Sequence, residues 1–218
     1  MDGLIRTLSL SLVLTAFVAV ESRGLRRALA AYVAQATLMV ALIAAFAARH
    51  PALWVWAATA LVTKLGLMSW LVARALRRGD GREAPPYVGR APSAAIVALL
   101  ALGVYHLVHR HAGFLAPTTL AELEPHRTNV AVSLTLLCTG AWAVLSRRDA
   151  IKIVLGVCLM ENGAHLSLVS LAPGMRETVL VGIVTDVVVA VFLLLHLAGG
   201  IEARLGTRDT GRLRALRW

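Results

Sequence analysis

The sequence predicts an all-α protein, a polytopic transmembrane bundle of about seven spans. Hydrophobic residues make up 58% of the chain and charged residues only 16%, whereas a soluble domain carries about 25% charged residues. Apolar runs of about 20 residues, the length that a helix needs to cross a bilayer, recur along the chain. We expect the spans at Leu4–Val20, Ala28–Ala48, Ala52–Ala73, Ser93–Val108, Thr128–Ser146, Ala150–Ala172 and Glu177–Ala198.

The first and fourth of these runs are the shortest, close to the lower limit for a helix that spans with little tilt. The first run does not resemble a cleavable signal. Its one nearby cation is Arg6, and no Ala-x-Ala-like site follows it.

The cations fall mainly in alternate connecting segments. With seven spans, 16 of the 22 Lys and Arg residues lie on one side of the membrane and five on the other. The positive-inside rule then places the amino terminus outside and the carboxyl terminus in the cytoplasm. The net charge of +10 is therefore interpreted as topology and as attraction to anionic lipid, and we expect no nucleic-acid partner.

Breaks in the apolar pattern divide the chain into four parts. Residues 1–92 form an N-terminal three-helix part that ends in a cytoplasmic loop, and residues 93–127 hold the fourth span and an outer loop. Short turns separate the last three spans, so residues 128–200 are expected to form a compact three-helix unit. Residues 201–218 form a basic cytoplasmic tail.

Three spans carry an ionisable residue near mid-depth: Lys64, Glu161 and Asp186. Each lies roughly 13–18 Å from a helix end at 1.5 Å per residue. A charge at that depth costs about 2.5–3.5 kcal/mol on insertion scales and usually marks an ion or proton path. We expect the three to face the bundle interior, a partner subunit or a hydrated cavity, where opposite charges can pair.

The sixth span concentrates this chemistry. Cys158, Glu161 and His165 are spaced i, i+3, i+7 and line one helix face, with Asn162 beside them. Because histidine titrates near neutrality, Glu161 and His165 form a plausible proton step. Lys152 lies at the cytoplasmic end of the same span, and its ammonium is expected to reach the interface.

Structural roles remain open for these residues. Glu161 could simply hold Lys64 or a neighbouring subunit's cation, His165 could hydrogen-bond a facing helix, and Asp186 could be a packing device.

Other candidates are weaker. The His106, His109 and His111 cluster has the spacing of a metal site, but no carboxylate or cysteine follows until Glu122, so we expect no metal. Cys138 and Cys158 lie in different spans and behave as small hydrophobes. We find no phosphate loop, nucleophile–base set or cofactor motif, and expect no cofactor and no active site in this chain. An aromatic belt is expected at Trp54, Trp56 and Trp70.

The segment Ser146–Leu166, with its Met-Glu-Asn-Gly element, closely resembles hydrogenase-4 component E. The Thr-Asp pair within Val181–Val187 and the element Val62-Thr-Lys-Leu65 resemble the same family. The last three spans are similar, more distantly, to the K subunit of respiratory complex I and to the small C subunit of multisubunit cation/proton antiporters. The K-subunit acid would align at Cys158, one turn from Glu161. Family members often carry a proline after the third-span lysine, where this chain has Gly66-Leu-Met-Ser69.

The resemblance implies a non-catalytic membrane subunit of a nickel–iron hydrogenase or formate hydrogenlyase complex in the bacterial or archaeal cytoplasmic membrane. Its implied partners are antiporter-like and complex I H-like membrane subunits, and lipid. Glu161 and His165 would pass protons, or another cation, laterally to or from Asp186 and neighbouring subunits, and Lys64 would tune or extend the path. Two alternatives remain: a structural subunit that bridges larger pumps, and a component of a cation/proton antiporter without hydrogenase.

Overall fold

The computed structural model describes residues 2–77, 83–115, 118–174 and 177–211. The regular secondary structure there is helical, apart from one isolated bridge between Asp149 and Asp209. The all-α prediction is confirmed, and seven helical segments are long and apolar enough to cross a membrane. The elements are α1 (Asp2–Glu21), α2 (Leu25–Ala47), α3 (Leu53–Ala60), η1 (Leu61–Met68), α4 (Ser69–Leu76), α5 (Arg90–Leu115), η2 (Thr119–Glu122), α6 (His126–Ser146), α7 (Ala150–Leu171) and α8 (Glu177–Leu205).

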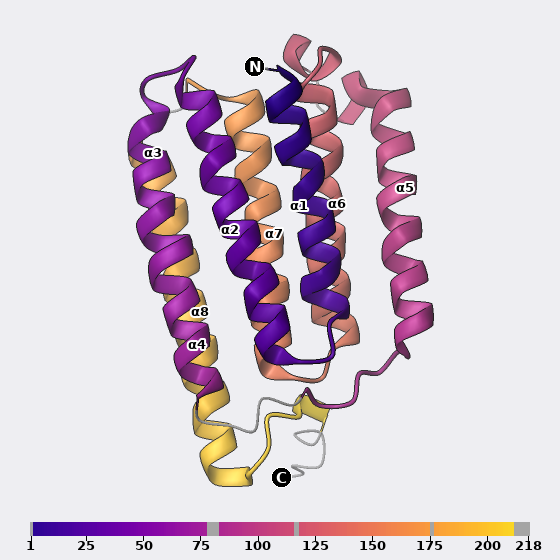
Figure 1. Ribbon diagram of the computed structural model, residues 1–218, viewed down its shortest axis with the longest axis vertical. Helices are drawn as coiled ribbons and strands as arrows, with labels where there is room; N and C mark the ends of the chain where they lie inside the picture. Colours follow the sequence, from indigo (N-terminus) through magenta and orange to yellow (C-terminus); the bar gives the residue numbers. More distant parts are fainter. Residues whose placement is uncertain (1, 78–82, 116–117, 175–176, 212–218) are drawn as a thin grey trace.

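Four helices, α1, α2, α6 and α7, form the centre of the bundle (Figure 1). Helix α5 stands at one edge. The third span, made of α3, η1 and α4, stands with α8 at the other edge. The start of α1 and the end of α8 lie at opposite ends of the bundle in Figure 1, which agrees with an odd number of spans.

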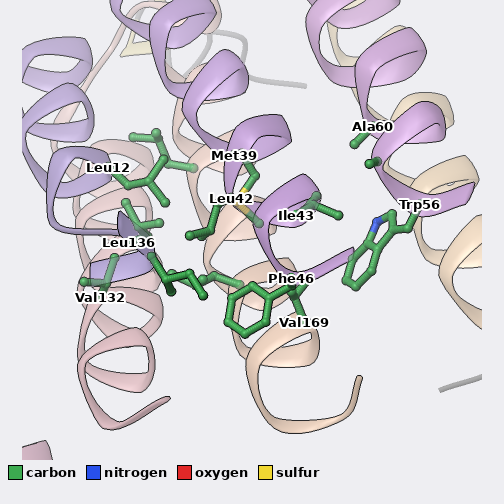
Figure 2. Packing of buried hydrophobic residues seen from close by; sticks show 14 of the residues in the cluster. Leu12, Met39, Leu42, Ile43, Phe46, Trp56, Ala60, Val132, Leu136 and Val169 are labelled. Atoms are coloured by element: carbon green, nitrogen blue, oxygen red, sulfur yellow. The ribbon is translucent and has the colours of Figure 1, made fainter. Parts of the chain in front are cut away.

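Aliphatic side chains fill the centre of the bundle (Figure 2). Leu12, Leu42 and Leu136 come from α1, α2 and α6, and Phe46 and Val169 close the same cluster toward one end. A second cluster joins α2, α4, α7 and α8. Within a bilayer such contacts stabilise through close packing rather than through removal of surface from water.

The closest helix pair is α6 with α7, and glycines allow the approach. A Cβ atom added to Gly140 would lie 2.5 Å from the carbonyl oxygen of Gly156, and one added to Gly163 would lie 2.6 Å from that of Ser133. The Ser133 hydroxyl also donates to the Gly163 carbonyl at 2.7 Å. Small residues at such a contact let two backbones meet, and the contact fixes the rotation of α7.

Two spans differ most from their predicted lengths. The fourth was expected at Ser93–Val108, but α5 begins at Arg90 and ends at Leu115, passing through His109–His111 with a non-helical backbone at His111. The seventh was expected to end at Ala198, but α8 continues to Leu205. An apolar run ends where polar residues begin, whereas the backbone hydrogen bonds of the helix continue past that point.

Candidate functional site

The third span changes its backbone around Lys64. Residues Leu61–Met68 form a π-helix between two α-helical halves. The Lys64 side chain is 1% exposed, so it points into the bundle. Wide turns of this kind are rare and occur frequently at functional sites.

Lys64 joins the third span to α7. Its Nζ atom donates a 2.6 Å hydrogen bond to Asn162 Oδ1 and lies 3.1 Å from Glu161 Oε1. The Glu161 side chain is 6% exposed. The two opposite charges therefore pair inside the bundle, near the middle of both helices.

His165 extends this group by one helical turn toward Leu171. Its Nδ1 atom lies 3.4 Å from Glu161 Oε1, and its ring meets the edge of the Trp56 indole with centroids 5.3 Å apart. The prediction of an aromatic belt is wrong for Trp56, which is 3% exposed, whereas Trp54 and Trp70 are each 54% exposed. The Trp56 indole packs in the central hydrophobic cluster, which accounts for its burial.

Several buried polar atoms around this group have no hydrogen-bond partner among the described residues. They are Glu161 Oε2, Asn162 Nδ2, both ring nitrogens of His165 and Trp56 Nε1. On α2, both side-chain polar atoms of Gln35 are also buried without a partner. Buried polar atoms normally find a partner because leaving them unpaired is costly. The group thus combines one ion pair with unused capacity to bind protons or water.

Two buried polar residues of α2 were missed from the sequence. Tyr32 and Gln35 of α2 are fully buried, and Tyr32 packs in the same cluster as Cys158. Cys158 lies one turn from Glu161 toward Ala150. A tyrosine and a glutamine in an otherwise apolar span were the signal that could have identified them.

Asp186 lies apart from this group. It is exposed on α8, whereas the buried side chains among those described on that helix are Val191, Leu195 and Ala198. At 3.6 residues per turn, Leu195 lies half a turn around the helix from Asp186. The Asp186 carboxylate therefore faces away from the bundle.

Lys152 is also separate, and the prediction that it reaches the interface is wrong. Its side chain is 1% exposed. The ammonium donates to the carbonyl oxygens of Ala19, Val20 and Ser22 at 2.7, 2.9 and 3.0 Å. These carbonyls end α1, so Lys152 satisfies acceptors that a helix end leaves open.

A second charged group surrounds Lys152 at this end of the bundle. Arg147 bonds Glu21 at 2.6 Å, and the Glu83 carboxylate lies 3.5 Å from Arg147 Nη1 and 3.9 Å from Lys152 Nζ. Burial raises the pKa of Glu83 although these cations and Arg90 oppose the shift. The group ties the loop before α5 to the ends of α1, α6 and α7.

The histidine cluster is spread along the end of α5. His109 lies 3.5 Å from Glu124 and stacks on Tyr105. Within the described residues, no three His, Cys, Asp or Glu side chains converge as metal ligands.

Comparison with known proteins confirms the resemblance drawn from the sequence. The chain is 29% identical to hydrogenase-4 component E of Escherichia coli (strain K12) over 209 residues, 94% of each chain. It is 28% identical over 155 residues to an uncharacterized protein of Mycobacterium tuberculosis, a match that covers 69% of this chain and 66% of that one.

A family model points the same way. Residues 129–218 match the family described as NADH-ubiquinone/plastoquinone oxidoreductase chain 4L, a stretch that includes most of α6 and all of α7 and α8. No solved structure matches the chain. The chain is thus a multi-pass membrane protein similar to hydrogenase-4 component E along nearly its whole length.

Proposed function

We propose that this chain is a membrane subunit of an energy-converting, hydrogenase-4-like complex, in which the Lys64–Glu161–His165 group exchanges protons during ion translocation. Redox chemistry would take place in other subunits. The similarity to hydrogenase-4 component E supports the kind of complex. The observation that carries the ion-translocating role is the Lys64–Glu161 pair, which is buried at mid-span with His165 beside it.

The geometry suggests how such a group would work. Glu161 lies between the ammonium of Lys64 and the imidazole of His165. When Lys64 stays close, Glu161 is stabilised as a carboxylate. When Lys64 moves toward another partner, Glu161 takes up a proton. A conformational change that alters this one distance would thus couple to proton uptake and release.

Partners and location follow from the same proposal. The neighbours would be antiporter-like and complex I H-like membrane subunits, and the membrane would be the cytoplasmic membrane of a bacterium or archaeon, with the amino terminus outside. The coupling ion, H⁺ or Na⁺, is left open.

Substitution of Glu161 by Gln tests the role. The expected result is a complex that still assembles but translocates ions at least about tenfold more slowly, since a positioned acid–base group contributes at least that much. Ion uptake is measured in vesicles that contain the purified complex. Asp2→Asn is the matched control, because Asp2 is an exposed carboxylate at the end of α1, and its rate should equal that of the unmodified complex.

One observation favours a second candidate, a structural subunit that bridges larger pumps. The 3.1 Å contact between Lys64 and Glu161 would also serve simply to hold the third span on α7. Under this alternative, the Glu161→Gln complex translocates at the unmodified rate once assembled, and that result would reject the proton-exchange role.

A further inference from the structure

Helix α8 presents a carboxylate outward at mid-depth. Asp186 lies nine residues from the start of α8, and Glu161 lies ten residues from the adjacent end of α7. At 1.5 Å per residue, the two depths are about 14 and about 15 Å. Asp186 therefore stands at the level of the buried ion pair but on the opposite side of α8.

The surroundings of Asp186 are apolar. Val189, Leu193 and Leu197 follow it at helical spacing and share its face, which we call the α8 outer face. Val189 is 50%, Leu193 52% and Leu197 60% exposed. A carboxylate on such a surface would face hydrocarbon if lipid covered it, and intramembrane acids almost always face protein or a water-filled cavity instead.

The described residues offer Asp186 no cation at that level. Among them, the one cation at mid-depth in the spans is Lys64, which is buried and bonded to Asn162 and paired with Glu161. A second copy packed on the same face would bring another Asp186, a like charge, and no cation. The partner of Asp186 must then come from a different chain.

We propose that the α8 outer face receives a membrane-spanning helix of another subunit, which places a basic side chain opposite Asp186. This inference rests on the proposed function in one respect, that the chain is part of a larger membrane complex. Packing supplies the attraction along Val189, Leu193 and Leu197. The buried charge pair sets the register, because a shift by one turn would leave both charges in hydrocarbon.

Photo-crosslinking in the assembled complex identifies the occupant. A photoreactive amino acid is placed at Leu193, and the crosslinked peptide is sequenced from native membranes. The expected product is a membrane-spanning segment of another subunit with Lys, Arg or His at the level of Asp186. A product with a second copy of this chain, with lipid only, or with a segment that lacks a basic residue at that level would overturn the proposal.

Charge reversal supplies the second readout. Asp186→Lys should lower recovery of the crosslinked subunit with this chain at least about tenfold, and the reciprocal Lys-to-Asp change in that subunit should restore it. Glu122→Lys is the control, because Glu122 is an exposed carboxylate in η2, outside the spans, and recovery should be unchanged. Equal recovery for Asp186→Lys and the unmodified chain would refute the pairing.

The two proposals fail separately. Recovery of a subunit is measured without ion translocation, so a failed docking test leaves the Glu161 experiment intact. Conversely, if the Glu161→Gln complex translocates ions at the unmodified rate, the proton-exchange role is rejected. The α8 outer face then remains an interface in a complex that has another role.

Discussion

Helices α7 and α8 are consecutive spans that each carry a carboxylate near mid-depth, yet their surroundings are opposite. Glu161 of α7 is 6% exposed and lies 3.1 Å from a cation of the same chain. Asp186 of α8 is exposed and faces away from the bundle. In the apolar part of each helix that would cross the membrane, 67% of the α7 residues are buried, against 11% of the α8 residues.

The difference separates two ways of placing an acid in a membrane. The charge of Glu161 is compensated inside the chain, so the chain can fold around it without help. The charge of Asp186 is not compensated by any described residue, so α8 depends on what packs beside it. Folding of this chain alone compensates the charge on α7, whereas the charge on α8 is compensated only when the complex assembles.

The largest expected effect comes from removing the internal cation. Lys64→Met leaves Glu161 buried without its counter-charge and should lower the free energy of unfolding by about 3 kcal/mol, since breaking a buried pair strands the remaining charge. Chemical denaturation of the purified chain in detergent measures it. Lys64→Met combined with Glu161→Gln should recover most of the loss. If Lys64→Met alone is as stable as the original chain, the Lys64–Glu161 pair does not contribute to the free energy of unfolding.

Close packing gives the next largest effect. Gly140→Ala places a Cβ atom 2.5 Å from a backbone oxygen of α7, so it should cost about 1–3 kcal/mol through overpacking. Gly199→Ala on α8 is the control, because nothing lies within 4 Å of the added atom. Thermal unfolding of both variants in detergent tests this contrast. Similar melting temperatures would contradict the tight contact between α6 and α7.

A smaller effect is expected from pH at the end of the bundle where α7 begins. Burial raises the pKa of Glu83 in the folded chain, so the folded state holds its proton more tightly than the unfolded state does. The stability that Glu83 contributes is therefore present at low pH and is lost as pH rises through the folded pKa. Glu83→Gln should flatten this fall as pH rises above the ordinary glutamate pKa of about 4.3. The denaturation midpoints of both chains are measured at several pH values. If stability falls more steeply with pH in the variant than in the original chain, the pKa of Glu83 is not raised by folding.

The smallest effect is expected at Asp186. In the isolated chain, Asp186→Asn should change the free energy of unfolding by less than about 0.5 kcal/mol, because exposed positions away from special contacts contribute little. The denaturation assay used for Lys64→Met checks it. A loss of more than about 2 kcal/mol would mean that Asp186 has a partner within its own chain, and the contrast between α7 and α8 would disappear.

The spans and the residues at mid-depth could be predicted from the sequence because both depend on composition. Runs of apolar residues are long enough to count, and a charge within such a run stands out. The pairing of Lys64 with Glu161 could only be suggested, since it depends on which helices become neighbours.

Rotation and long-range contacts could not be predicted. Asp186 and Glu161 look alike in the sequence, and only the packing of Val191 and Leu195 turns Asp186 outward. Lys152 has the position of an interfacial anchor, but the end of α1 captures its ammonium. Tyr32 and Gln35 were overlooked because uncharged polar residues in a span stand out less than a charge does.

The contact between Lys152 and the end of α1 has a consequence for biosynthesis. Helix α1 is completed by a side chain made 133 residues after Ala19. At 5–20 residues per second, the wait is roughly 7 to 27 s. During that time the open carbonyls of α1 depend on water or lipid headgroups, so this early span reaches its final form only when α7 arrives.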